Sequence, residues 1–306
     1  PADNKPFILV AGEVSPSQLV HLNTNRVLGI VTMTGGAASH TAIMARALNI
    51  PLVIGLEGKM TEAIRTGDML IIDGKTGRVI LHPTPEEIEH YSAKRENQVR
   101  VRERLRALTA LPSVTTDQVR MSLFANIASL RELETALESG AEGVGLFRTE
   151  FIYMDRDDFP SEEEQFQIYC RAAEMLDGKP LTIRTLDIGG DKFLDYMETP
   201  DEDNPVLGFR SIRISLVRPE PFKTQLRAIL RAGACGPVQV MFPMIQSIEQ
   251  FRAAKTVFEQ AKRELREEGL KHDENMRVGI MVEVPAAALI ADVLAKEVDF
   301  FSIGTN

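Results

Sequence analysis

The 306-residue sequence lacks tryptophan, has only two cysteines and five histidines, and contains no apolar run long enough to cross a membrane. A spanning helix needs about 18 consecutive apolar residues, so we expect no membrane insertion. The cysteines, Cys170 and Cys235, stand far apart without a CxxC pair, and the histidines show no zinc-ligand spacing. We therefore expect neither a disulfide framework nor a structural zinc site.

Positive charge is also scarce, because 35 Lys and Arg face 44 Asp and Glu, a formal net charge of −9. Nucleic-acid binding needs clustered Lys and Arg, so we expect no nucleic-acid partner. With 44% hydrophobic and 26% charged residues, the sequence can bury a core, which excludes a wholly disordered chain. No signal peptide opens the sequence, and the expected location is cytoplasmic.

The first part of the sequence, residues 1–84, alternates short β-branched runs with glycine turns. The runs predict strands, and the segment 40–50 between two of them has the pattern of a helix. This combination predicts a small mixed α/β domain.

A long charged segment follows, and residues 85–112 are assigned as a linker helix. Thr84 is placed as its N-cap, Pro85 at its first helical position, and Leu108 near its end. Glutamates are interleaved with its basic residues, which favours a solvated helix face over a nucleic-acid surface.

Strand and helix patterns alternate through residues 113–306, with six apolar strand candidates. Strands buried on both faces and separated by helices predict a parallel sheet covered by helices. The α/β fold is then either an open doubly wound sheet or a (β/α)8 TIM-type barrel truncated after its sixth strand.

The sharpest local motif is TGGAASHTAIMAR, in which Gly35 and Gly36 lead into a helix that begins near His40. A helix N-terminus presents unpaired amides and the positive end of the dipole, which favour an anion. An imidazole placed there stays neutral and is suited to accept a phosphoryl group. Alternatively Ser39 is an ordinary N-cap and His40 a surface residue, and the residues alone leave both readings open.

The stretch GGAASHTAIMARALNIPLVIG resembles the phosphohistidine signature of phosphoenolpyruvate-utilising enzymes, in which the histidine after Gly-Gly-x-x-Ser carries the phosphoryl group. Later blocks, including LFRTE, TIRTLDIGGDK, NPVLGFRSIRI, VMFPMI, MVEVPAA and DFFSIGTN, are similar in order to the barrel of enzyme I of the bacterial sugar phosphotransferase system. Together the blocks cover nearly the whole sequence. The enzyme I branch fits better than the pyruvate phosphate dikinase or phosphoenolpyruvate synthase branch.

The resemblance implies transfer of a phosphoryl group from phosphoenolpyruvate to His40 and on to a histidine-containing phosphocarrier protein (HPr), the first step of sugar uptake. It implies a requirement for Mg²⁺, with Glu283 as a ligand, and a homodimer formed through the barrel. The substrate-binding residues that it implies are Arg148, Arg184, Arg210 and Asn306.

The chemistry of the substrate supports arginines independently of the family. Phosphoenolpyruvate carries a phosphate and a carboxylate, and arginine presents a planar fork that binds either group through two bonds. Barrel active sites lie on the face where the strands end. Four arginines stand at or just beyond predicted strand ends: Arg148, Arg184, Arg210 and Arg213. The alternative is structural pairing with Glu150, Asp187 or Asp191.

Glu283 ends an apolar predicted strand just before Pro285. An unpaired carboxylate is costly there, and a bound metal ion would remove that cost. Mg²⁺ prefers one or two carboxylates together with substrate oxygens and water. The alternative is a salt bridge between Glu283 and one of the arginines.

Some features depart from the family pattern. Ala37 and Ala38 stand where an arginine and a threonine are common, and neither cysteine matches the family's catalytic cysteine, which the resemblance places after Asn306 together with the second metal ligand. Two other functions remain open: a dikinase or synthase-type phosphotransferase, and an inactive fragment or non-catalytic scaffold.

Overall fold

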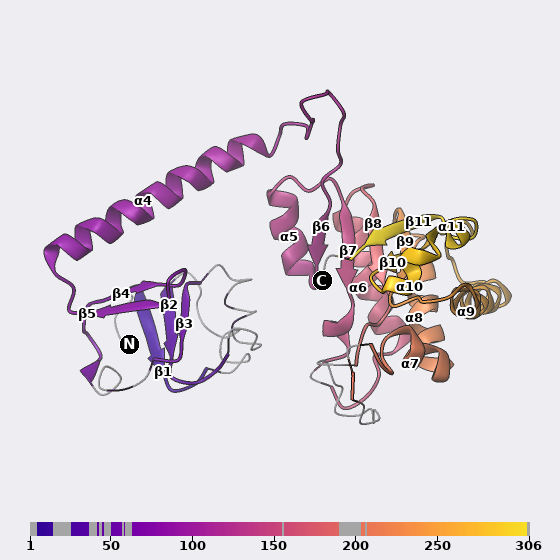
Figure 1. Cartoon of the computed structure of the whole chain (residues 1–306), viewed down its shortest axis with the longest axis horizontal. Coiled ribbons are helices and arrows are strands. Elements are labelled where there is room, and N and C mark those ends of the chain that lie inside the picture. The colour runs from indigo at the N-terminus through magenta and orange to yellow at the C-terminus, as the bar shows by residue number, and fades with distance from the viewer. Residues whose placement is uncertain are drawn as a thin grey trace. The chain divides into compact units, whose positions relative to one another are not determined.

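The computed structural model describes residues 5–14, 26–36, 42, 45, 50–56, 58, 63–154, 156–189, 203–205 and 207–304. The chain divides into two compact units, Pro1–Ala107 and Leu108–Asn306 (Figure 1). The predicted site residues His40 and Asn306 lie outside the described residues.

The first unit contains a three-stranded parallel sheet and a separate antiparallel hairpin. The sheet has the order β1-β2-β3 and consists of β1 (Phe7–Ala11), β2 (Val27–Thr32) and β3 (Leu52–Ile54). The hairpin pairs β4 (Leu70–Asp73) with β5 (Arg78–Leu81). The mixed α/β prediction is confirmed for the described residues, although most of the helix predicted over 40–50 lies outside them; Ala42 and Ala45 are helical.

The charged helix α4 spans Pro85–Leu108, in agreement with the predicted helix. It begins with a capping box: the Glu87 N–H donates to Thr84 Oγ1 over 3.3 Å, and the Thr84 N–H donates to Glu87 Oε2 over 2.9 Å. No residue of α4 is buried. Lys94 Nζ donates to Asp73 Oδ2 over 2.5 Å and so links α4 to the hairpin.

The second unit is built on six parallel strands in the order β11-β10-β9-β8-β7-β6. They are β6 (Ala125–Ile127), β7 (Val144–Arg148), β8 (Leu181–Arg184), β9 (Val238–Phe242), β10 (Val278–Val282) and β11 (Phe300–Ile303). The order follows the sequence without the reversal that defines a doubly wound sheet. The doubly wound alternative is therefore wrong, and the sheet has the strand order of part of a barrel.

Helices alternate with these strands (Figure 1). They are α5 (Leu130–Glu138), the 3-10 helix η1 (Glu150–Ile152), α6 (Glu162–Met175), α7 (Ile212–Val217), α8 (Pro219–Ala232), α9 (Ile248–Glu267), α10 (Pro285–Leu289) and α11 (Ala291–Leu294). The helices α5, α6 and α9 each follow a serine N-cap whose hydroxyl accepts a backbone N–H. None of the helices in the described ranges is long and apolar enough to cross a membrane.

Some predicted elements differ from the structure at their ends. The final predicted helix is divided into α10 and α11 because Ile290, with φ −110° and ψ 18°, leaves the helical conformation. The first predicted strand of this unit is reduced to β6, because Gln118 has a φ of 67° and a turn closes the isolated bridge between Val114 and Arg120. The short helix α7 was not predicted.

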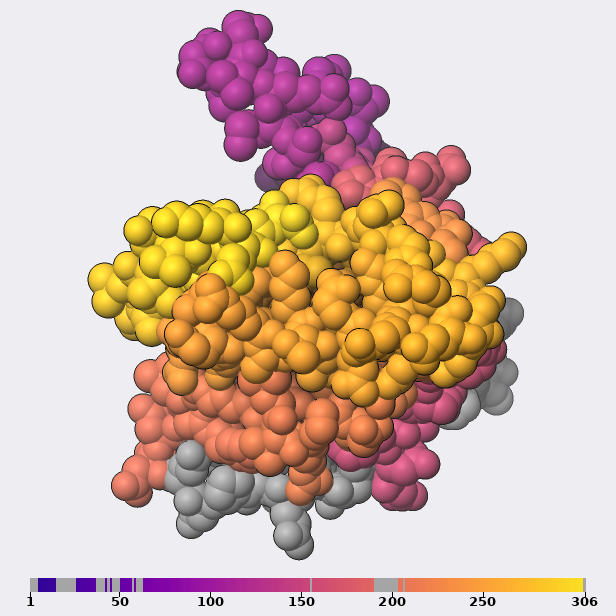
Figure 2. Space-filling view, turned by 90° about the vertical axis from the view of Figure 1, so that its right-hand side faces the viewer, coloured from indigo at the N-terminus to yellow at the C-terminus, as the bar shows by residue number. Residues whose placement is uncertain are grey.

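The core of the second unit lies between the sheet and its helices, with Phe147, Leu181 and Phe242 of the strands against Tyr169, Leu226 and Phe251 of the helices. The helix α8 contacts both α6 and α9. Arg227 of α8 reinforces these contacts through Glu162 of α6 and Glu268, which directly follows α9, at 2.5 and 2.6 Å. Figure 2 shows this outer face, where the gold surface of α9 lies next to the salmon surface of α7 and α8.

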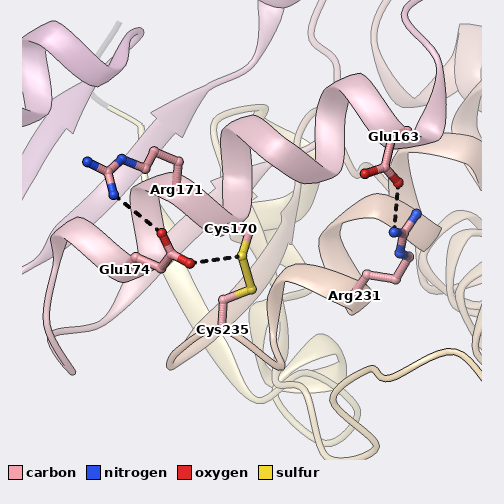
Figure 3. The surroundings of a disulfide bond; sticks show 6 residues. All are labelled: Glu163, Cys170, Arg171, Glu174, Arg231 and Cys235. Atoms are coloured by element: carbon pink, nitrogen blue, oxygen red, sulfur yellow. Dashed lines mark hydrogen bonds and ion pairs between the residues drawn. A yellow bond between two sulfur atoms is a disulfide. The ribbon is translucent and has the colours of Figure 1, made fainter.

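A disulfide joins Cys170 of α6 to Cys235, which follows α8 (Figure 3). The expectation of no disulfide is wrong at this pair. It rested on spacing along the sequence, whereas the packing of α6 against α8 brings the two Cα atoms to 5.4 Å, within reach of a disulfide. Next to it, Glu163 of α6 pairs with Arg231 of α8 over 2.8 Å. The disulfide thus joins α6 to the segment after α8, and the ion pair joins α6 to α8 itself.

Candidate functional site

Two arginines stand side by side at the carboxyl edge of the six-stranded sheet. Arg148 is the last residue of β7 and Arg184 the last residue of β8, and the two are register partners. Side chains in register on neighbouring parallel strands share one face of the sheet. Arg184 extends across that face, since its NH1 lies 4.0 Å from the Sδ of Met281 on β10. The structure thus brings together two of the predicted substrate-binding residues.

Arg184 is buried between two carboxylates. Its NH2 lies 2.5 Å from Glu150 Oε1, its NH1 lies 3.1 Å from Asp187 Oδ2, and all three side chains are at most 7% exposed. Burial disfavours the charged form, but Glu150 and Asp187 outweigh that effect and raise the pKa of Arg184. The guanidinium is therefore charged and held in place.

Arg210 shares one of these carboxylates, because its NH2 lies 2.9 Å from Asp187 Oδ1. Asp187 thus bridges Arg210 and Arg184. Arg210 packs against Gly189, where a Cβ atom would lie 2.5 Å from the Arg210 Cβ, so this approach requires glycine. The ion pairs considered as an alternative from the sequence are present for both arginines, and Asp191 lies outside the described residues.

Arg148 differs from its neighbour. Its Nε is buried without a hydrogen-bond partner, and no ion pair to its guanidinium is formed by the described part of the chain. The Nε of Arg184 is likewise buried and unpartnered among the described residues. A buried donor without an acceptor is costly, and an anion would relieve that cost through strong charge-assisted bonds. The adjacent arginines therefore retain donors suited to an anionic ligand.

The environment of Arg213 differs from those of Arg148, Arg184 and Arg210. It donates to the carbonyl oxygens of Leu207 and Gly208 and, over 2.8 Å, to Gln246 Oε1. These bonds tie the segment before α7 to the segment after β9. In this structure Arg213 stabilises loops at the same edge of the sheet.

Glu283 directly follows β10, and its Oε1 accepts the N–H of Met244 over 2.7 Å. Met244 has a φ of 56°, which is uncommon for a residue with a side chain. Burial raises the pKa of Glu283 and the nearby Asp187 adds to this effect, whereas the Met244 N–H and two nearby arginines oppose it. Glu283 is thus a partly buried carboxylate within electrostatic range of Arg184 and Arg210.

This environment suits Mg²⁺ bound in part by the protein. A carboxylate whose burial disfavours ionisation gains from a neighbouring cation, and Mg²⁺ takes oxygen ligands. Within the described ranges, no three His, Cys, Asp or Glu side chains cluster so as to hold a metal ion by themselves. Glu283 fits a site in which substrate oxygens and water complete the coordination, as is usual for Mg²⁺.

The sequence did not predict the buried polar residues that lie behind Arg148 and Arg184. Thr149 and Gln225 are at most 1% exposed and are hydrogen-bonded to each other over 3.1 Å. The available signal was a glutamine on the apolar face of α8, between the buried Phe222 and Leu226. Glu150 was considered only as a possible partner of an arginine, and that pairing is present.

The predicted phosphoryl acceptor His40 lies outside the described residues, as do Ala37 and Ala38. The preceding Gly35 and Gly36 are described and follow β2. Gly35 has a φ of 120°, a conformation that favours glycine.

The described residues thus form a small α/β unit and a parallel sheet whose carboxyl edge gathers arginines suited to an anionic ligand. The chain belongs to the PEP-utilising enzymes. The PEP-binding domain of that family matches residues 102–306, and its mobile domain matches residues 3–77.

Several curated relatives are named phosphoenolpyruvate-protein phosphotransferase. The protein from Staphylococcus carnosus is 47% identical over 303 residues, which are 99% of this chain and 53% of the relative. The protein from Haemophilus influenzae is 49% identical over 299 residues, 98% of this chain and 52% of the relative. The chain spans about half the length of the curated relatives it matches.

One solved structure, described as an NMR solution structure of Enzyme I (nEIt), is 39% identical. The match covers 32% of this chain and 39% of that chain, with a TM-score of 0.29.

Proposed function

We propose that the protein transfers the phosphoryl group of phosphoenolpyruvate to His40 and then to a histidine-containing phosphocarrier protein (HPr), the first step of sugar uptake by a phosphotransferase system. The observation that carries the proposal is the adjacent pair Arg148 and Arg184, with buried, unpartnered Nε donors at the carboxyl edge of the sheet. The names of the curated relatives support the same reaction.

In this proposal Arg148 and Arg184 bind the phosphate and carboxylate of phosphoenolpyruvate, and Arg210 contributes from the far side of Asp187. Arginine suits both anionic groups because its fork donates two parallel hydrogen bonds. Asn306 is proposed as a further phosphate contact on the family resemblance alone, since it lies outside the described residues.

Glu283 is the proposed Mg²⁺ ligand. When bound, Mg²⁺ would neutralise charge on the phosphoryl oxygens. The carboxylate of Glu283 is held by the Met244 N–H, which fixes one of its oxygens. The other oxygen is the one we assign to the metal ion.

The proposed architecture is a (β/α)8 barrel to which residues 113–306 contribute six strands, with residues 1–84 as the phosphohistidine domain and 85–112 as the linker helix. The strand order, which follows the sequence, and the arginines at the carboxyl edge support a barrel. A homodimer formed through the barrel and a cytoplasmic location complete the proposal, both on the family resemblance.

The test is labelling with phosphoenolpyruvate that carries ³²P. This chain and a longer protein of the length of its relatives are incubated with labelled phosphoenolpyruvate and Mg²⁺, beside His40→Ala. Acid-labile label that His40→Ala abolishes would support the proposal. Label from ATP but not from phosphoenolpyruvate would instead indicate a dikinase or synthase. No label from either donor would indicate a non-catalytic protein.

A further inference from the structure

A buried hydrogen-bond bridge lies directly behind the two arginines of the site. Gln225 of α8 accepts the Leu186 N–H at its Oε1 over 2.9 Å and donates from its Nε2 to Thr149 Oγ1 over 3.1 Å. Thr149 follows Arg148 in the sequence, and Leu186 stands two residues after Arg184. One side chain therefore holds the segments that follow both arginines.

Thr149 closes the bridge from the other side. Its Oγ1 donates to the backbone carbonyl of Arg184 over 3.0 Å, so the hydroxyl both donates to β8 and accepts from Gln225. Thr149 is 0% exposed and Gln225 is 1% exposed. Without competing water, these bonds fix the end of β7 relative to the end of β8.

The bridge specifies the chemistry of residue 225. The Leu186 N–H needs an acceptor, while Thr149 Oγ1, which already donates to a carbonyl, needs a donor. A carboxamide supplies an acceptor and a donor at the required separation, whereas a thioether or a carboxylate cannot supply both. The second N–H of Gln225 is also used, since Nε2 lies 3.3 Å from the hydroxyl of Tyr169.

Packing alone does not explain a glutamine here. Its neighbours on α8, Phe222, Leu226 and Ile229, are apolar and at most 3% exposed, so an apolar side chain would suit the same face. Burying an amide is unfavourable unless its hydrogen bonds are made. The glutamine at this position is therefore explained by its hydrogen bonds to Leu186 and Thr149.

We propose that Gln225 is a positioning residue for phosphoenolpyruvate binding, which sets the placement of Arg148 relative to Arg184 through Thr149 and Leu186. This inference rests on the proposed function, because the consequence of positioning is measured as affinity for phosphoenolpyruvate. The placement itself is measurable without that ligand.

Gln225→Met removes the bridge and keeps the volume, and Gln165→Met is its matched control. Gln165 is 1% exposed, accepts from the Tyr153 hydroxyl over 2.8 Å and from the Tyr169 hydroxyl over 3.3 Å, and donates to the Pro160 carbonyl over 3.0 Å. It therefore shares Tyr169 with Gln225, but no bond joins its side chain directly to Thr149 or Leu186 in the described part of the chain. Both variants thus replace a buried, bonded glutamine on a helix of the same unit. Thermal melts by circular dichroism establish that both are folded.

Two readouts are needed. The first is the pair of ¹H–¹⁵N Nε signals of Arg148 and Arg184, assigned with Arg148→Lys and Arg184→Lys, because the burial of both Nε atoms protects their protons from exchange. The second is the Kd for phosphoenolpyruvate with Mg²⁺ by calorimetry. Gln225→Met should shift both signals and raise the Kd by about tenfold or more, since small misplacements of binding groups are costly. Gln165→Met loses the bond to the shared Tyr169 hydroxyl but keeps the bonds of Gln225 to Thr149 and Leu186, so its Kd should stay close to that of the wild type.

Unshifted signals and an unchanged Kd in a folded Gln225→Met protein would overturn the positioning role. Equal effects of Gln165→Met and Gln225→Met would also overturn it. They would show that the loss of either buried amide is enough to shift the signals and raise the Kd. Shifted signals in a protein whose wild type does not bind phosphoenolpyruvate would support the placement and refute the proposed function. If Gln225→Met does not fold, Thr149→Val removes the same bridge from β7 and must shift the same two signals, or the proposal is wrong.

Discussion

An ion pair between Lys94 and Asp73 attaches α4 to the β4–β5 hairpin, and Asp73→Asn tests it. Lys94 Nζ lies 2.5 Å from Asp73 Oδ2, and the Lys75 N–H donates to Asp73 Oδ1 over 3.1 Å. No side chain of α4 is buried. The helix therefore has little apolar contact to hold it against the hairpin once this pair is lost.

The pKa of Asp73 gives the magnitude. The hydrogen bond from Lys94, supported by the Lys75 N–H and opposed by burial, lowers it from 3.8 to about 2. At about 1.36 kcal/mol per pKa unit this corresponds to about 2 kcal/mol. Asp73 is 8% exposed but Lys94 is 36% exposed, so solvent screening reduces the expected contribution to about 1–2 kcal/mol.

The sign of the pH dependence follows from the lowered pKa. The carboxylate stabilises the folded unit fully above the ordinary Asp pKa of 3.8, and this stabilisation is lost as the pH falls through about 2. Wild type and Asp73→Asn should therefore differ most near neutral pH and converge toward pH 2.

The assay is hydrogen exchange near neutral pH, followed by mass spectrometry in peptides of α4 and of the β4–β5 hairpin. A loss of 1–2 kcal/mol accelerates exchange about 5- to 30-fold. Asp73→Asn and Lys94→Met should each do so, and the double variant should be no worse than either alone. Arg100→Met is the control on the same helix, because its pair with Glu96 is exposed and 3.6 Å long. Unchanged α4 exchange in Asp73→Asn, or fully additive effects, would refute the reasoning.

Other perturbations address the second unit. Reducing the Cys170–Cys235 disulfide should lower its thermal stability, with about 4 kcal/mol as the upper bound for a closed loop of 65 residues, measured by calorimetry with and without reductant. Arg227→Met should cost about 1–3 kcal/mol in urea unfolding, because Arg227 joins carboxylates of both α6 and α9. Glu283→Gln keeps an acceptor for the Met244 N–H and should remove the Mg²⁺ dependence of phosphoenolpyruvate binding without unfolding the protein.

Each of these predictions has a control or an outcome that would contradict it. Arg171→Met removes an exposed pair with Glu174 on the outer surface and should cost less than about 0.5 kcal/mol, which sets the scale for Arg227→Met. A disulfide whose reduction leaves the melting temperature unchanged would show that packing and the ion pairs of Arg227 and Arg231 hold α6 and α8 together without it. Mg²⁺-dependent binding that persists in Glu283→Gln would exclude Glu283 as the metal ligand.

Local sequence signals were sufficient for elements whose ends are chemically marked. Thr84, Pro85 and Glu87 define the start of α4 within a few residues, and serine N-caps mark three helices of the second unit. The order of the six strands in the sheet, in contrast, could not be predicted from local signals. Six βα repeats are compatible with either a doubly wound sheet or part of a barrel, and only the pairing of strands distinguishes them.

The missed features share one cause, because each depends on partners far away in the sequence. Cys170 and Cys235 become neighbours only through the packing of α6 on α8. Gln225 acquires its partners Thr149 and Leu186 only when α8 covers the ends of β7 and β8. A polar residue on an apolar helix face signals a buried partner, but the face alone does not identify it.

The arginines could be anticipated because a strand end is a local property and the carboxyl ends of parallel strands meet at one edge. The charged groups around each arginine could not be anticipated in this way. The structure gives Arg184 two buried carboxylate partners, while Arg148 has none within the described residues. An incoming anion must compete with Glu150 and Asp187 for Arg184, but not for Arg148. We therefore expect Arg184 to act mainly as a rigidly placed contact and Arg148 to supply the larger share of the electrostatic attraction, a division that requires the two to be held in a fixed relation by the strands and side chains behind them.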